Sequence, residues 1–397
     1  MSKTPTPAKA AATTTAATAT TPEPIESLRP PAEIVYAREL AALAANDTEA
    51  RPRGWRLSPR AVRTFIAGAS KPLEHEWQGQ RVETSIERKY FGDDTLIERC
   101  VITLAGNRGL LLVGEPGTAK TMLSELLSAA ISGDSTNTVQ GTAGTTEDQI
   151  KYSWNYALLL AEGPSERALV PAPLHVGMRG GILTRFEEIT RCPPEIQDTL
   201  VSILSDKVLL VPELDGEARV VLARPGFNVI ATANLRDRGV HEMSSALKRR
   251  FNFETVQPIG DLALEVKLVM EQTERLLAEA GAPITMDRDI VELLVTTFHE
   301  LREGTTSDGK KLERPSTSLS TAEAVSVGFA AGLDAYYYGE RRLTGDRVVR
   351  HLSGAVIKDN ADDLKRLRHY FDTVVQQRGR EYGEPWQGYY HARKWLD

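Results

Sequence analysis

The stretch that most constrains the fold of this chain is residues 109–131, which read GLLLVGEPGTAKTMLSELLSAAI. It begins with a short apolar run at residues 110–113, as is typical of a buried parallel strand. The segment GEPGTAKT follows at residues 114–121, and apolar side chains then recur at helical spacing. A glycine-rich loop between a strand and a helix presents backbone N–H groups and a helix N-terminus to phosphate. The stretch therefore predicts a phosphate-binding P-loop in an α/β fold.

Individual residues of this loop have distinct expected roles. Lys120 should reach the β- and γ-phosphates of a nucleotide, and the Thr121 hydroxyl should ligate Mg²⁺. Ala119 stands where the P-loop pattern has its second glycine, and a methyl group is the smallest change there. The alternative, a chance match in a glycine-rich turn, is disfavoured because the flanking strand and helix both fit. The predicted nucleotide-binding set is Gly114, Glu115, Pro116, Gly117, Thr118, Ala119, Lys120, Thr121 and Met122.

A second informative stretch, GILTRFEEITR, lies at residues 181–191. Its first half should form a strand that ends at Glu187 and Glu188. Adjacent acids at a strand end after a P-loop indicate a Walker B pair, in which Glu187 holds Mg²⁺ through water and Glu188 activates the attacking water. However, Glu187 is one methylene longer than the usual Asp, and Thr184 and Arg185 interrupt what should be an apolar central strand. An ordinary edge strand running into a helix cap therefore stays open as the alternative.

Two further segments suggest catalytic side chains. Residues 227–233, FNVIATA, predict another buried strand, and the Asn234 that follows could orient water beside a γ-phosphate. The alternative for Asn234 is an ordinary turn residue. Residues 244–251 predict a short helix that ends in cations, which suit a helix C-terminus. The functional interpretation is an arginine finger for a neighbouring subunit's nucleotide, supplied by Arg249 or Arg250.

The remaining segments predict further helices, a hairpin and an insertion. The pair 208–211 and 219–222 should form a β-hairpin around Asp215-Gly216, and residues 152–178 should form an insertion that is partly strand. The aromatic tail from residue 379 should pack back on its own domain, with a docking peptide as the alternative. Helices are expected at 32–45, 59–69, 193–206, 261–280, 287–302, 317–338 and 361–378.

Bulk properties narrow the class of protein. A length of 397 residues suggests two or three units. The net charge of −6 offers no basic field for nucleic acid. No apolar run approaches the length of about 18 residues that a membrane span needs, and the N-terminus lacks signal and transit features. We therefore expect a cytoplasmic protein, in which Cys100 and Cys192 stay reduced.

Taken together, the motifs resemble the AAA+ ATPases and, within them, the MoxR-like group. GEPGTAKT is similar to that group's Walker A, where Ala in the second-glycine place is usual, and FEEITRCPPEIQDTLVSIL resembles its Walker B with the following helix. ATAN, which ends at Asn234, matches sensor 1, and ALKRRF is similar to the arginine-finger segment, with Arg250 just before Phe251. The insertion and the hairpin fall where this clade carries its helix-2 insert and pre-sensor-1 hairpin. The resemblance covers roughly residues 85–340.

The resemblance implies a P-loop AAA+ core with a parallel sheet, an inserted β-hairpin and an α-helical lid. The expected cofactors are ATP and Mg²⁺, with Thr121 and Glu187 as metal residues and Glu188, Asn234 and Arg250 as catalytic residues. The expected domains are a disordered Ala/Thr/Pro-rich tail (1–29), a small helical segment (30–85), the nucleotide-binding domain (86–258), the lid (259–340) and a helical extension with an aromatic tail (341–397).

The family resemblance also implies a homo-hexamer that hydrolyses ATP to remodel protein partners, often beside a von Willebrand factor A protein. Three departures favour an alternative, a degenerate, non-hydrolysing, nucleotide-dependent scaffold. They are Glu187, Arg185 in the preceding strand, and Leu319, which stands near the expected sensor-2 arginine, with Arg314 close but not aligned. A DNA-associated motor NTPase is the third possibility, and the acidic net charge weighs against it.

Overall fold

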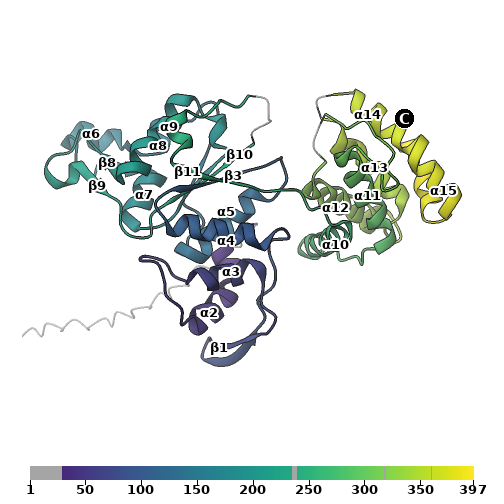
Figure 1. Cartoon of the computed structure of the whole chain (residues 1–397), viewed down its shortest axis with the longest axis horizontal. Coiled ribbons are helices and arrows are strands. Elements are labelled where there is room, and N and C mark those ends of the chain that lie inside the picture. The colour runs from purple at the N-terminus through teal and green to yellow at the C-terminus, as the bar shows by residue number, and fades with distance from the viewer. Residues whose placement is uncertain (1–28, 235–238, 317–318, 359) are drawn as a thin grey trace, which may run out of the picture. The chain divides into compact units, whose positions relative to one another are not determined.

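The computed structural model describes residues 29–234, 239–316, 319–358 and 360–397 (Figure 1). Contacts divide the chain into residues 1–30 and residues 31–397, and the elements below belong to the second unit. The disordered tail predicted for residues 1–29 lies almost wholly outside the described residues.

The described part of the chain begins with a small module that contains a β-hairpin as well as helices. The predicted 32–45 helix is broken at Tyr36, and Ser58 caps the next helix by accepting the Ala61 N–H at 3.2 Å. The purely helical prediction for residues 30–85 missed the hairpin, because its strands are mostly polar and contain no apolar run. Gln78 and Gly79, with φ of 52° and 78°, form its two-residue turn. The elements are α1 (Ala32–Val35), α2 (Ala37–Asn46), α3 (Pro59–Ala67), β1 (Leu73–Trp77) and β2 (Gln80–Thr84).

A five-stranded parallel sheet forms the centre of the α/β part, as the sequence predicted. Its order is β11-β3-β10-β7-β4, so β7 is an inner strand. The edge strand β11 was not predicted, because alternating exposure leaves it without an apolar run. The strands are β3 (Gly109–Val113), β4 (Thr138–Gln140), β7 (Thr184–Glu187), β10 (Val229–Ala233) and β11 (Phe251–Thr255).

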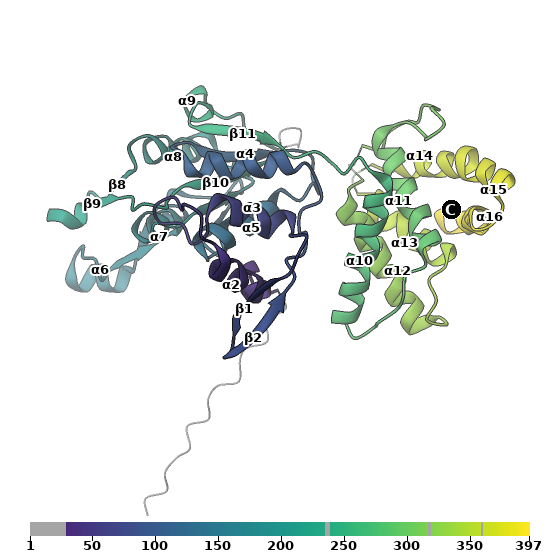
Figure 2. The same ribbon diagram turned by 60° about the horizontal axis from the view of Figure 1, so that its bottom comes forward.

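Helices cover both faces of this sheet. Leu110 and Leu112 pack with side chains of α4 (Asp94–Ala105) and α5 (Lys120–Ser132), whereas Leu111 and Val113 pack with α7 (Pro173–Gly180) and α8 (Pro194–Asp206). Alternate side chains of β3 therefore enter opposite cores, as strand geometry requires. The N-terminal module joins the first of these cores, and α3 contacts α4 and α5 (Figure 2).

The predicted insertion and hairpin are both present. The insertion contains β5 (Tyr152–Trp154), α6 (Tyr156–Glu162) and β6 (Leu169–Pro171). The hairpin pairs β8 (Val208–Leu210) with β9 (Val220–Leu222), and a 3₁₀ turn at Gly216–Arg219 precedes β9. Shorter elements are 3₁₀ turns at Glu147–Gln149 and Ile189–Arg191, and helix α9 (Ser245–Lys248).

The C-terminal part is helical and has one continuous apolar core, whose members run from Val266 to Leu396. The predicted helix at 361–378 is interrupted by a π-turn at Phe371–Val375, and α13 was not predicted. Tyr389 is fully buried against Phe371, so this part of the aromatic tail packs back on its own domain. The helices are α10 (Leu262–Glu279), α11 (Arg288–Glu303), α12 (Thr321–Tyr338), α13 (Gly345–Val356), α14 (Asp362–Tyr370), α15 (Gln376–Tyr382), α16 (Trp386–His391) and the 3₁₀ turn Ala392–Leu396 (Figure 1).

Across the described parts of the chain, no helix combines the length and the apolar character needed to cross a bilayer. Cys100 and Cys192 are both buried free thiols.

Candidate functional site

Three of the predicted motifs lie at the carboxyl ends of three adjacent strands. The glycine-rich loop follows β3, Glu187 is the last residue of β7 with Glu188 directly after it, and Asn234 follows β10. Because β3, β10 and β7 are parallel neighbours, these segments share one edge of the sheet. Ligands of open α/β sheets bind outside this carboxyl edge.

The loop after β3 has the backbone of a tight turn that opens a helix. Gly117 and Ala119 have left-handed φ values of 76° and 64°, and Ala119 is the N-cap of α5. The Lys120 ammonium donates to the carbonyls of Gly114 and Glu115 at 3.0 and 2.7 Å, so it lies across the loop. The Lys120 ammonium is thus placed to contact a phosphate group bound by the loop.

The other predicted loop residues lie around this turn. The Thr118 hydroxyl donates to the Glu115 carbonyl at 2.9 Å and closes the turn, while Pro116 is exposed. The Met122 side chain is exposed at the first turn of α5.

The Glu187 carboxylate is the best-connected group of the site, and the residue as a whole is only 4% exposed. Its Oε2 accepts hydrogen bonds from Thr121 Oγ1 at 2.9 Å and from Thr232 Oγ1 at 2.8 Å. Its Oε1 accepts from Ser124 Oγ at 2.6 Å and from Arg185 Nη2 at 2.8 Å. The sequence predicted the meeting of Thr121 and Glu187. It missed Ser124 and Thr232. The available signal was a hydroxyl among the buried residues of α5 for Ser124 and a hydroxyl among the apolar residues of β10 for Thr232.

The polar residues within β7 are buried and fully engaged. Because β7 lies between β10 and β4, the edge-strand alternative is wrong. Thr184 is completely buried and accepts from Asn137 Nδ2 at 3.0 Å. Arg185 donates from Nε to Ser124 Oγ at 3.0 Å and from Nη1 to the Ser135 carbonyl at 2.8 Å. A central strand tolerates these side chains because each buried polar atom has a partner.

Glu188 occupies a different environment from its neighbour Glu187. Its backbone is left-handed, with φ 54° and ψ 47°, a conformation that costs a non-glycine residue about 1–2 kcal/mol. Its N–H donates to Thr232 Oγ1 at 2.9 Å, and its half-exposed carboxylate pairs with Arg191. Strain of this kind is concentrated at functional sites. One acid is thus buried beside the loop, whereas the other reaches solvent.

Asn234 ends β10 with an acceptor that lacks a partner. Its Oδ1 is buried and makes no hydrogen bond among the described residues. A buried unpaired acceptor is destabilising unless a ligand or water satisfies it. Asn234 is therefore able to accept a hydrogen bond from such a group at the sheet edge.

The arginines after α9 are in unlike surroundings. Arg250 donates from Nη1 to the Ala246 carbonyl at 2.6 Å and from Nε to the Ser205 hydroxyl. Arg249 is exposed, and within the described part of the chain its guanidinium makes no hydrogen bond or ion pair. The finger assignment to Arg250 stays a prediction, with Arg249 as a structurally less constrained candidate.

The residues near the expected sensor-2 position have structural roles. Leu319 is completely buried in the helical core. Arg314 donates from Nε to the Glu303 carbonyl at 3.1 Å, at the C-terminal end of α11.

The oxygen atoms that meet beside the loop suit a divalent cation such as Mg²⁺. Thr121 Oγ1 and Glu187 Oε2 are both oxygens, lie 2.9 Å apart and meet beside the loop, and oxygen is the ligand that Mg²⁺ prefers. No cluster of three or more His, Cys, Asp or Glu residues suited to a metal occurs among the described residues. A Mg²⁺ ion here would need its further ligands from phosphate and water.

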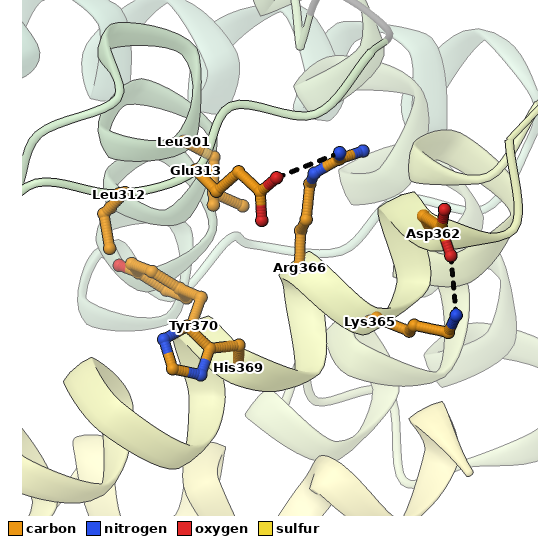
Figure 3. A pocket seen from close by; sticks show the side chains of 8 residues that line it. All are labelled: Leu301, Leu312, Glu313, Asp362, Lys365, Arg366, His369 and Tyr370. Atoms are coloured by element: carbon orange, nitrogen blue, oxygen red, sulfur yellow. Dashed lines mark hydrogen bonds and ion pairs between the residues drawn. The ribbon is translucent and has the colours of Figure 1, made fainter.

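A separate cavity of about 380 Å³ lies in the helical part (Figure 3). Its cations already have acidic partners: Arg366 Nη2 lies 3.1 Å from Glu313, and Lys365 Nζ lies 2.6 Å from Asp362. No predicted site residue lines it. The lining residues are Leu301, Leu312, Glu313, Asp362, Lys365, Arg366, His369 and Tyr370.

Comparison with known proteins agrees with this geometry. Residues 109–251 match the AAA domain of the dynein-related subfamily, and residues 263–397 match the YehL-like AAA+ ATPase C-terminal domain. The chain is 50% identical over 368 residues to the uncharacterised protein YehL of Escherichia coli (strain K12). This aligned region covers 92% of this chain and 96% of that protein. An uncharacterised protein of Staphylococcus haemolyticus is 32% identical over 200 residues, which is 49% of this chain and 69% of that protein.

Among solved structures, NtrX from Brucella abortus in complex with ADP has a TM-score of 0.45 at 12% identity, over 77% of this chain and 69% of that one. That likeness is too low to bear on function. The AAA+ prediction is confirmed by the family matches, while the narrower MoxR-like resemblance stays a prediction. With half of its residues identical to YehL over nearly the whole length of both proteins, the chain belongs to the YehL-like family of AAA+ ATPases.

Proposed function

We propose that this protein binds ATP with Mg²⁺ and hydrolyses it to remodel or assemble protein partners, as in MoxR-like chaperones. The observation that supports this most directly is the 2.9 Å hydrogen bond between Thr121 and Glu187, next to a second acid in a different environment. One acid is thereby available for a metal site and the other for proton transfer.

Binding rests on the loop and its lysine. Backbone N–H groups of the loop and of the first turn of α5 hold the phosphates, and Lys120 exchanges its carbonyl partners for the β- and γ-phosphates. Thr121 and Glu187 would hold Mg²⁺. When bound, Mg²⁺ neutralises charge that develops on the phosphates.

Hydrolysis rests on three further side chains. Glu188 leaves Arg191 and accepts the proton of the attacking water. Asn234 orients that water through the amide oxygen that lacks a partner among the described residues. Arg250 of a neighbouring subunit stabilises charge on the transferred phosphoryl group.

An arginine finger that acts on a neighbouring subunit requires assembly. We propose a homo-hexamer that acts in the cytoplasm on a protein substrate or a von Willebrand factor A partner.

A non-hydrolysing nucleotide-dependent scaffold is the second candidate function. Leu319 favours it, because this completely buried apolar side chain stands near the expected sensor-2 position, where it offers a nucleotide no cation.

The deciding experiment measures ATP turnover against protein concentration for the wild type and for Glu188→Gln in parallel. We expect wild-type turnover per subunit to rise with concentration, and Glu188→Gln to bind ATP but hydrolyse it about 10²–10⁴-fold more slowly. Glu166→Gln is the matched control, because Glu166 is an exposed acid paired with Arg179. ATP binding without turnover in the wild type would support the scaffold instead.

A further inference from the structure

Strand β7 carries a buried arginine two positions before its metal-side acid. Residues at this spacing lie on the same face of a strand, and the Arg185 and Glu187 side chains are only 8% and 5% exposed, with Nη2 and Oε1 2.8 Å apart. A buried ion pair is often no more stabilising than apolar side chains of similar volume. Stability alone therefore does not account for an arginine in this inner strand.

The guanidinium is held in one orientation by its other contacts. Nε donates to Ser124 Oγ at 3.0 Å, Nη1 to the Ser135 carbonyl at 2.8 Å, and Nη2 lies 3.3 Å from the Thr121 carbonyl. Because a guanidinium is planar and rigid, acceptors on each of its nitrogens leave it little freedom. Arg185 is thus a fixed donor beneath the Glu187 carboxylate.

The two oxygens of Glu187 have separate partners. Oε1 is bound by Arg185 and Ser124, whereas Oε2 faces the hydroxyls of Thr121 and Thr232. Thr121 and Ser124 are three residues apart on α5 and therefore share a helix face, which lets the carboxylate contact both. The Arg185 contact decides which oxygen is turned toward Thr121.

We propose that Arg185 is a positioning residue for Mg²⁺-dependent nucleotide binding: it anchors Oε1 of Glu187, so that Oε2 and the Thr121 hydroxyl are presented together to the cation. This inference rests on the proposed function. The two departures from the usual motif, the arginine in the strand and Glu in place of Asp, are then one matched arrangement.

The test compares the affinity for a non-hydrolysable ATP analogue in Mg²⁺ with that in EDTA, for the wild type and Arg185→Met. The ratio of these affinities, the Mg²⁺ gain, should fall about 10- to 100-fold, as is typical when a residue that orients a metal ligand is lost. The affinity in EDTA should stay near that of the wild type. Arg179→Met is the matched control, because Arg179 is exposed on α7, and its Mg²⁺ gain should be unchanged.

Several results would overturn the proposal. An unchanged or larger Mg²⁺ gain in Arg185→Met would show that the guanidinium does not position the carboxylate for metal, and equal losses in Mg²⁺ and in EDTA would show a purely structural role. In a Glu187→Gln background, Arg185→Met should cause no further loss of Mg²⁺ gain, and an independent, additive loss would contradict action through Glu187.

If Arg185→Met fails to fold, Arg185→Lys carries the test, since it retains the charge but not the fork of donors. We expect it to keep only part of the Mg²⁺ gain, and a full gain would overturn the proposal. Failure of the proposed function gives a distinct result, because the wild type itself would then show no Mg²⁺-dependent binding.

Discussion

The Thr121 hydroxyl donates a hydrogen bond to Glu187 Oε2 over 2.9 Å and so joins the first turn of α5 to the end of β7. These two residues are 66 positions apart in the sequence, and they meet because β3 and β7 both pair with β10 in parallel. The contact makes the loop and the acidic pair parts of one site, and each prediction below depends on a residue near it or on the domain that follows.

Lys120→Ala should abolish nucleotide binding. Lys120 brings an ammonium to the loop, and the loop carbonyls that it now contacts cannot replace that charge. Binding of a fluorescent ATP analogue measures the effect, with Lys267→Ala as a control because Lys267 is exposed on α10. Wild-type affinity in Lys120→Ala would show that the P-loop assignment is wrong.

Arg191→Ala should raise basal ATP turnover. Glu188 has to leave Arg191 before its carboxylate accepts a proton, and a half-exposed ion pair of this kind is worth at most about 1 kcal/mol, or about fivefold in rate. Steady-state turnover at saturating ATP is the measurement. A loss of turnover at unchanged ATP affinity would instead indicate that Arg191 assists the reaction.

The finger prediction separates Arg250 from Arg249. If Arg250 acts in trans, Arg250→Ala should bind ATP yet hydrolyse it about 10³–10⁵-fold more slowly. Mixing Arg250→Ala with Lys120→Ala should partly restore turnover, because some interfaces would join an intact ATP site to an intact finger. If Arg249→Ala shows this behaviour instead, the exposed arginine is the finger.

An ordinary helix-end role for these cations predicts a different result. Each alanine variant would then lose about 0.3–1 kcal/mol in the free energy of unfolding and would keep near-normal ATP turnover. Normal, concentration-dependent turnover in both variants would exclude a finger in this segment.

Ala119→Gly should stabilise the protein by about 0.5–1 kcal/mol. Left-handed backbone costs Ala about 1–2 kcal/mol, and glycine removes this strain while losing part of the gain to unfolded-chain entropy. Denaturant unfolding measures the change. Ala278→Gly in α10 is the control, and it should destabilise by about 1 kcal/mol. Equal destabilisation in both would argue against strain at Ala119.

Acid should destabilise the helical part through Glu265, which is completely buried. Burial raises the pKa of Glu265, but hydrogen bonds from His299 and Arg302, the Arg302 charge and the Thr321 hydroxyl outweigh it and lower the pKa to about 2. Because the folded pKa lies below the unfolded value, the stabilisation is complete above the unfolded pKa and is lost as the pH falls toward 2.

The expected loss is about 3 kcal/mol between roughly pH 5 and pH 2. Urea unfolding across this range, followed by a signal from the helical part, measures it. Glu265→Gln should remove much of the acid dependence, whereas Glu279→Gln, on an exposed part of α10, should not. An unchanged acid slope in Glu265→Gln would contradict the assignment.

Local patterns were sufficient to predict the elements that build the site. The apolar run at residues 110–113, the glycine-rich loop and the helical spacing after it are encoded within one short stretch, so periodicity identifies them. The acidic pair, Asn234 and the inserted hairpin were found for the same reason. The polar β1–β2 hairpin and the edge strand β11 were missed because they lack an apolar run. Helix α13 was missed although Val348, Val349 and Leu352 are buried at helical spacing.

The partners of each site residue depended on strand order, which local periodicity does not encode. From the sequence, Arg185 does not fit a buried strand. In the structure β7 does lie between β10 and β4, and Arg185 is accommodated there because Ser124 Oγ and the Ser135 carbonyl accept its hydrogen bonds. Ser124 and Thr232 carried no motif, yet both bind Glu187. Pattern analysis identifies residues whose role follows from their neighbours in the chain. The hydrogen bonds to Glu187 from Thr121, Ser124 and Thr232 join residues 45 to 66 positions apart along the chain, and only the packing of β7 against β10 and α5 brings them within reach.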